Sequence, residues 1–267
     1  MIAFVISGLQ AGVRGRSFQA VFVFGLLLVG VAYLSSGFSP RHPATVALDI
    51  GFSGIRFTLV MLQLFWIQEL VAKEIERKTV LHSLAYPVQR ASFLLGRYVA
   101  VLILGILAAV ILGLSLLLAV VAASAGYSQE TPVALGLPFW TVIGGLIVDV
   151  AVVAAVGLAV ATVSTVAIMP LAIGVAFAIG GKALGATVDY LWRGADGDAE
   201  LTSRLGPVVD VVRWIIPDLS RLDFRYWPMY GLPPSLTDVA LAILMGLAYA
   251  AVAIAIGILA FRRREFS

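Results

Sequence analysis

The chain has 267 residues, of which 61% are apolar and only 12% charged, with a mean hydropathy of +1.03. Soluble domains carry roughly 25% charged residues, so this composition excludes an ordinary soluble protein and indicates an integral membrane protein. The absence of cysteine excludes disulfides, zinc thiolates and iron–sulfur clusters, and the two histidines, His42 and His82, have no metal-site spacing. The net charge of +3 indicates no nucleic-acid partner, because the basic residues sort by side of the membrane instead.

Residues 1–17 are predicted to form a helix that lies in the membrane interface. Their apolar residues fall on one helical stripe and their polar residues on the opposite stripe, as in helices bound at the lipid headgroups. The apolar stripe is Ile2, Val5, Ile6, Leu9 and Val13, and the polar stripe is Ser7, Gln10, Arg14 and Ser17. The alternative is an irregular beginning of the first membrane span.

Six apolar runs follow, each near the roughly 20 residues that a helix needs to cross a bilayer. They cover residues 18–35, 50–70, 98–123, 139–163, 167–190 and 239–261. The first run is expected to remain in the protein, because further spans follow and no small-residue cleavage site is evident. The predicted fold is an all-α integral membrane protein, a single transmembrane domain over residues 1–267.

Lysine and arginine in the short connections predict the orientation of these spans. One side collects Arg14, Arg16, Lys73, Arg77, Lys78, Arg90, Arg97, Arg262, Arg263 and Arg264, whereas the opposite short connections hold only Arg41. Because basic residues stay in the cytoplasm, both termini are predicted to be cytoplasmic.

The charged segment between the second and third spans, residues 71–97, is the predicted attachment point for a cytosolic partner. Glu74 and Lys78 stand four residues apart, which favours a helix that continues into the cytosol. Thr79 is positioned to cap a second short helix, which Pro87 ends. Leu81 and Leu84 give that helix an apolar face, which is better explained by a protein partner than by a solvated loop.

The same segment resembles the first cytoplasmic element of ABC-2 type transporter permeases. The matching residues are Glu74, Glu76, Thr79, Leu81, Leu84, Pro87, Arg90, Gly96 and Arg97, and Lys78 stands where the family usually has glycine. The closing FRRREF also resembles the end of family members, and the layout of spans fits over the whole chain. Residues 216–231 resemble the loop of the branch named for multicopper-enzyme maturation, although the chain offers few copper ligands.

The resemblance implies a multi-pass subunit of the bacterial inner membrane that pairs with a second permease subunit, a copy or a related chain, and with two cytosolic ABC ATPase subunits. It implies that Glu74, Glu76, Arg77, Thr79, Leu81, Leu84, Pro87 and Arg90 couple to the ATPase. ATP and magnesium would bind that partner and no cofactor would bind this chain. The sequence is consistent with the nucleotide binding to the partner, because GGKA at residues 180–183 lacks the pattern of a phosphate-binding loop. The sequence also shows no set of residues typical of a catalytic site.

Asp149 lies about ten residues into the fourth predicted span, which is about 15 Å deep at 1.5 Å per residue. A charged aspartate there costs on the order of 2.5–3.5 kcal/mol, so it is expected to face protein or water. Arg56 and Lys182 are its candidate partners. The group is either a polar spot on a translocation path or an ion pair that holds the bundle together.

The long connection of residues 191–237 is predicted to be extracytoplasmic. Apolar residues between positions 205 and 216 recur with helical spacing, which predicts an amphipathic helix on the membrane surface. Mixed charge beside aromatic residues, at Arg213, Trp214, Arg225 and Trp227, is typical of a surface for an extracytoplasmic protein. The alternative is a cap that only contacts membrane lipid.

Three functions are compatible with these features. The first is the permease subunit of an ABC-2 type exporter, which a separate ATPase drives. The second is a mechanical transmitter that passes the motion of the ATPase to an extracytoplasmic maturation protein. The third is an ion-coupled secondary carrier, for which Asp149 is the supporting residue.

Overall fold

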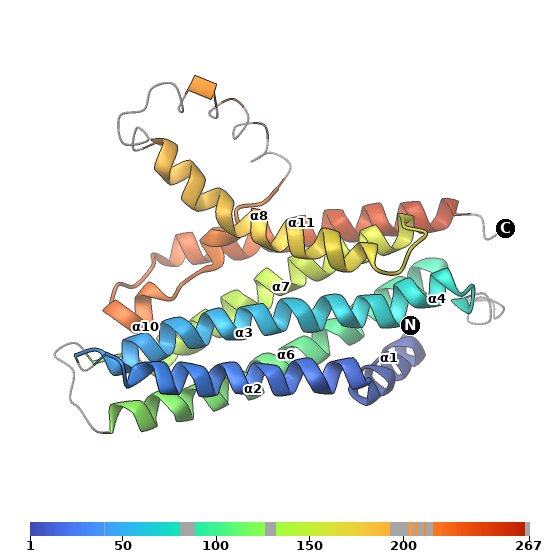
Figure 1. Cartoon of the computed structure of the whole chain (residues 1–267). Helices are drawn as coiled ribbons and strands as arrows, with labels where there is room; N and C mark the ends of the chain where they lie inside the picture. The colour runs from blue at the N-terminus through green and yellow to red at the C-terminus, as the bar shows by residue number, and fades with distance from the viewer. Residues whose placement is uncertain are drawn as a thin grey trace.

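The protein is a bundle of long helices that lie side by side along one axis (Figure 1). The computed structural model describes residues 1–39, 41–80, 89–125, 132–192, 203, 204, 207, 211 and 216–264. Both termini lie at the same end of the bundle (Figure 1), which is called the termini end here and the opposite end the far end. Among the described residues the fold is all-helical, as predicted.

Six of the helices are long and apolar enough to cross a membrane, which confirms the predicted number of spans. They are α2 (Arg16–Ser36), α3 (Pro43–Ile67), α6 (Arg90–Ser124), α7 (Leu137–Val163), α8 (Met169–Trp192) and α11 (Leu236–Arg263). Short elements complete the described chain: α1 (Ile2–Arg14), the π-helical turn η1 (Gln68–Ala72), α4 (Lys73–Glu76), the 3₁₀ turn η3 (Leu219–Leu222) and α10 (Tyr226–Tyr230).

Local sequence signals account for several of the helix ends. Proline occupies the first turn of α3 and of α7, where its missing N–H is not needed. Ser235 caps α11, because its Oγ accepts a hydrogen bond of 3.0 Å from Asp238 N. Helix α3 begins seven residues before its predicted span and runs without a break through η1 into α4, which makes one rod from Pro43 to Glu76.

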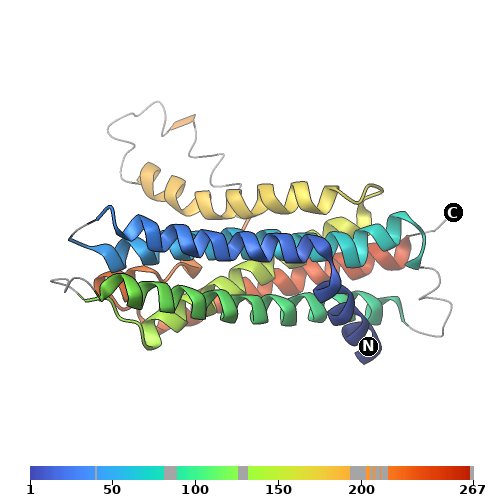
Figure 2. The ribbon, with the colours of Figure 1, turned by 60° about the horizontal axis from the view of Figure 1, so that its bottom comes forward.

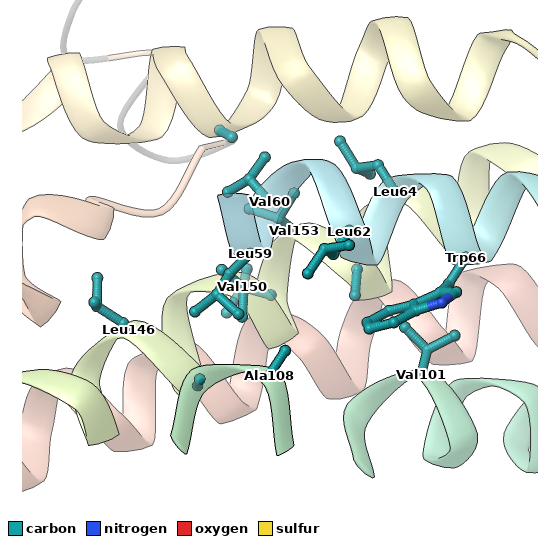
Figure 3. Packing of buried hydrophobic residues seen from close by; sticks show 14 of the residues in the cluster. Leu59, Val60, Leu62, Leu64, Trp66, Val101, Ala108, Leu146, Val150 and Val153 are labelled. Atoms are coloured by element: carbon teal, nitrogen blue, oxygen red, sulfur yellow. The ribbon is translucent and has the colours of Figure 1, made fainter. Parts of the chain in front are cut away.

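The centre of the bundle consists of α3, α6 and α7. Buried residues make up 61% of the most apolar stretch of α3 and 67% of that of α7, against 17% in α2 and 22% in α8 and α11. The side chains of α3, including Leu59, Leu62 and Trp66, fill the space between these helices (Figure 3). Val60 and Leu64 point from α3 toward α8 (Figure 3), where Leu64 packs against Gly174. The outer helices α2, α8 and α11 thus present most of their surface outward.

Residues 1–17 contain a helix, and it crosses the end of α6 at an angle to α2 (Figure 2). Gly8 and Gly12 face the bundle and lie against Ala100 and Leu104 of α6, and Phe4 and Leu9 also pack against the core. Gly12 O accepts a hydrogen bond of 3.1 Å from Trp66 Nε1. The ends of the predicted apolar stripe, Ile2 and Val13, are exposed. Helix α1 therefore joins the bundle through its glycines and part of its apolar side chains, while Ile2 and Val13 at its two ends face outward.

Candidate functional site

The rod formed by α3, η1 and α4 ends in a left-handed turn. Lys73 and Glu69 form an ion pair of 2.7 Å along its last turns, and the helix stops at Arg77. Lys78 then adopts a φ of 57°, a conformation that glycine adopts far more readily than lysine. Lys78 is also the position at which the resemblance expects glycine, so the backbone here has the shape that such a glycine would give.

Glu74 connects this rod to α6 and α1. Its Oε1 lies 2.5 Å from Nη2 of Arg97, whose side chain is almost fully buried. Nη1 of Arg97 donates a hydrogen bond of 3.3 Å to Ser7 Oγ on α1. The predicted coupling residue Glu74 is therefore bonded inside the chain and fixes the rod to two neighbouring helices.

Glu76 and Arg90 make similar connections to the remaining helices. Glu76 Oε1 accepts a hydrogen bond of 3.1 Å from Ala167 N in the turn between α7 and α8. Arg90 Nη1 donates to Phe261 O, Arg262 O and Arg264 O at the end of α11, at 2.9–3.3 Å. Such bonds satisfy carbonyls that a helix end leaves without partners. Arg264 does the same for α7, since it donates to Thr162 O and Ser164 O.

The other predicted coupling residues divide into two groups. Arg77 and Thr79 are exposed at the tip of the termini end, where Thr79 Oγ1 donates to Glu74 O at 3.2 Å. Leu81, Leu84 and Pro87 lie outside the described residues, as does the predicted helix that they belong to. In the described part of residues 71–97, Glu74, Glu76 and Arg90 thus bond to other parts of the bundle, whereas Arg77 and Thr79 face outward.

A second polar region lies toward the far end, around Asp149. Its Oδ2 lies 2.5 Å from Nε of Arg56, and its side chain is 2% exposed. Nη2 of Arg56 also donates to Ala178 O on α8 at 3.1 Å. Of the two cations that the sequence offers to Asp149, Arg56 forms the ion pair, and it connects α3, α7 and α8.

Lys182 pairs with a different acid, Asp223, in the connection between α8 and α11. Asp223 Oδ1 accepts a hydrogen bond of 2.8 Å from Arg225 Nε, and Arg225 Nη1 lies 2.6 Å from Asp49 Oδ1 on α3. Burial by itself raises the pKa of Asp223, but the positive charges of Lys182 and Arg225 outweigh it and lower that pKa. The acid is therefore held as a carboxylate between two cations.

Asp223 and Arg225 belong to a segment that enters the bundle, residues 216–225, called the inserted segment here. Its Leu219 and Leu222 are buried against α7, α8 and α11. Three glycines make room for it: Gly145 of α7 faces Leu222 O, while Gly181 and Gly185 of α8 face Leu219 and Ser220. Gly145 is eight residues from the far end of α7, or about 12 Å along the helix. Irregular backbone at such depth is tolerated where protein or a cavity surrounds it.

The sequence predicted an extracytoplasmic partner surface at Arg213, Trp214, Arg225 and Trp227. The structure places Arg225 inward, in contact with Asp223 and Asp49, with 18% of its side chain exposed. Trp227 is partly buried, whereas Arg213 and Trp214 lie outside the described residues, together with most of the predicted amphipathic helix. The sequence signal that could have indicated this close contact is the glycine pair Gly181 and Gly185, spaced as GxxxG, although it does not identify the segment that packs there.

A cavity of about 540 Å³ lies between α3, α8 and the inserted segment, and we call it the charged cavity. Its polar side chains are Asp49, Ser53, Arg56, Lys182, Asp223, Arg225 and Tyr226, and its apolar side chains include Phe57, Val60, Met61, Val175 and Ile179. Its volume is in the range of small-molecule sites. Among the described residues, no group of three His, Cys, Asp or Glu side chains is arranged to hold a metal ion.

No protein-family model matches the chain, and no curated protein is similar to it.

Proposed function

We propose that this chain is the permease subunit of an ABC-2 type exporter, with both termini in the cytoplasm of a bacterial cell. One observation carries the proposal: within the segment of residues 71–97, the side chains of Glu74, Glu76 and Arg90 bond to several other helices of the bundle. They connect α1 and α6 through Arg97, α7 and α8 through Ala167, and α11 through its last carbonyls. A force applied to this segment therefore reaches five helices at once.

Such an arrangement suits a subunit that another protein moves. A permease without its own nucleotide site must receive motion from a partner that binds ATP and magnesium, here two cytosolic ABC ATPase subunits. The partner acts on the exposed tip at Arg77 and Thr79 and on residues 81–88, which follow in the sequence and lie outside the described residues. A tilt of the rod would be shared with α6, α7 and α11 and would open a path between this chain and a second permease subunit.

The test is the recovery of the ATPase with the permease. The double variant Leu81→Asp/Leu84→Asp is expected to lose the co-purifying ATPase, because a charged helix face cannot dock in an apolar groove. A matched control is Leu232→Asp/Leu236→Asp, which changes two exposed leucines at the far end. Both proteins should insert in the membrane in equal amounts. Undiminished ATPase on the first variant would refute the proposal.

The charged cavity favours a second candidate, an ion-coupled carrier. Ionisable residues at membrane depth often mark ion or proton pathways. Arg56, Lys182 and Asp223 line the cavity, and the buried Asp149 pairs with Arg56. This candidate needs no ATPase. Uptake or release by the purified chain in vesicles, driven by a proton gradient alone and abolished in Asp149→Asn, would support the carrier over the exporter.

A further inference from the structure

We infer that the charged cavity binds a zwitterionic amphiphile, with its ammonium group outermost, its phosphate next and its hydrocarbon chain innermost. The inference goes beyond the proposed permease function, because it concerns binding by this chain alone, with no ATPase present. It rests on the order of the side chains along the cavity.

The lining changes from charged to apolar along α3. Asp49 and Ser53 come first from the far end, Arg56 follows, and Phe57, Val60 and Met61 line the deeper part. The step from Asp49 to Arg56 is about 10 Å along the helix at 1.5 Å per residue. Helix α8 repeats the order, with Lys182 outermost and Ile179 and Val175 deeper. An amphiphile with its head toward the far end matches this gradient.

The cavity is also open to the side on which lipid would lie. Two of its apolar lining residues, Phe57 and Ile179, are 50% and 64% exposed, one on α3 and one on α8. Toward the termini end, the two helices close together where Leu64 packs against Gly174. A hydrocarbon chain can therefore enter between α3 and α8 without leaving an apolar environment.

The charges favour a zwitterion over a simple anion. Three cations, Arg56, Lys182 and Arg225, are balanced by three acids, Asp49, Asp149 and Asp223, as the ion pairs show. An anion alone would leave an excess charge in this partly buried network, whereas a zwitterion keeps the sum at zero.

Both the phosphate and the ammonium group of a zwitterion can also form hydrogen bonds in the charged cavity. Among the described residues, nothing accepts a hydrogen bond from Arg56 Nη1 or Arg225 Nη2, so both can donate to a phosphate. Asp49 uses Oδ1 for Arg225, and about half of its side chain is exposed, so its other oxygen can accept from an ammonium group.

The test is a binding titration on the purified chain in detergent micelles, read as the rise in melting temperature with the mole fraction of ligand. Three ligands share one acyl chain: lysophosphatidylethanolamine, lysophosphatidic acid, which lacks the ammonium group, and monoacylglycerol, which lacks both charges. The first is expected to bind about three- to tenfold more tightly than the second. The third is expected to give no saturable shift.

Two variants locate the site. Asp49→Asn is expected to bring the affinities for the two phospholipids within about twofold of each other, because the ammonium group is the part of the ligand that would bond to that carboxylate. Val175→Trp, which fills the apolar part, is expected to weaken both phospholipids at least tenfold. Its control is Ile173→Trp, an exposed residue of the same helix that lines a different cavity. Equal affinity of the wild-type chain for the two phospholipids, or binding unchanged by Val175→Trp, would overturn the inference.

Discussion

Arg56 on α3 and Asp149 on α7 form an ion pair in which Nε and Oδ2 lie 2.5 Å apart. The aspartate is buried, and the same guanidinium donates to Ala178 O on α8. One cation thus connects three helices, and the side chain of the acid is almost completely shielded from solvent. Breaking such a pair by removing one partner is costly, because the other charge stays buried.

We therefore predict that Asp149→Leu lowers the free energy of unfolding by about 3 kcal/mol or more, because it leaves Arg56 uncompensated. The double variant Asp149→Leu/Arg56→Leu should recover much of this loss, since no charge is then left buried. Thermal melting of the purified protein in detergent measures both effects.

The matched control is Asp149→Leu/Lys182→Leu. Lys182 pairs with Asp223, so this variant leaves Arg56 without its acid and Asp223 with Arg225 alone, and it should be no more stable than Asp149→Leu. A recovery of stability in this variant, and not in the one that lacks Arg56, would show that Lys182 is the partner of Asp149. A neutral effect of Asp149→Leu would mean that the region is well hydrated.

Adjacent glycines of α7 test the packing of the inserted segment. A Cβ at Gly145 would stand 2.4 Å from Leu222 O, a backbone atom that cannot rotate away, whereas a Cβ at Gly144 would meet nothing within 4 Å. Gly145→Ala should therefore destabilise the protein by about 1–3 kcal/mol. Gly144→Ala should be neutral or stabilise it by up to about 1 kcal/mol, because alanine favours the helix. Equal melting temperatures for the two variants would contradict this packing.

Hydropathy alone predicted the six spans, because a membrane helix needs a long apolar run and the chain has few others. It also indicated that Asp149 needs a cation. Hydropathy could not identify which cation pairs with Asp149, since Arg56 and Lys182 lie at similar depth. The rotation of each helix about its axis decides the pairing.

The inserted segment was not predicted, and the reason is local composition. Asp223 and Arg225 lie in a stretch of mixed charge, which has the pattern of an exposed loop, and their partners Lys182 and Asp49 lie at least 41 residues away. The resemblance named Glu74 and Arg90 as coupling residues, and it gave no indication of their bonds to Arg97 and to the end of α11. A sequence shows that a charge is present but not which distant group neutralises it.

Lys78 provides a test of the turn after α4. Its φ of 57° costs a residue with a Cβ about 1 kcal/mol relative to glycine. Lys78→Gly is therefore expected to raise the free energy of unfolding by up to about 1 kcal/mol. The control is Arg77→Gly, whose φ of −81° is ordinary, so glycine there should only add freedom to the unfolded chain and destabilise. Destabilisation by both variants would argue against a left-handed residue at position 78.

The acid dependence of stability should report on Asp223. Lys182 and Arg225 lower its pKa below the 3.8 of an ordinary aspartate, although burial acts in the opposite direction. A carboxyl group with a lowered pKa in the folded state stabilises the protein fully above pH 3.8 and loses this contribution as the pH falls through the folded value. At pH 7, Asp223→Asn should melt at a lower temperature than the wild type, because Lys182 has lost its counter-charge.

Melting temperatures of both proteins from pH 7 to pH 2.5 measure this effect. The difference between them should stay constant down to about pH 4 and shrink below it, as protonation makes the wild-type acid resemble asparagine. Groups away from this charge network titrate alike in both proteins, so the difference reports on Asp223 and the charges next to it. Arg225→Gln removes one of the two cations and should move the loss of stability to higher pH. A difference that widens on acidification would mean that the pKa of Asp223 is raised, and that burial outweighs its two cations.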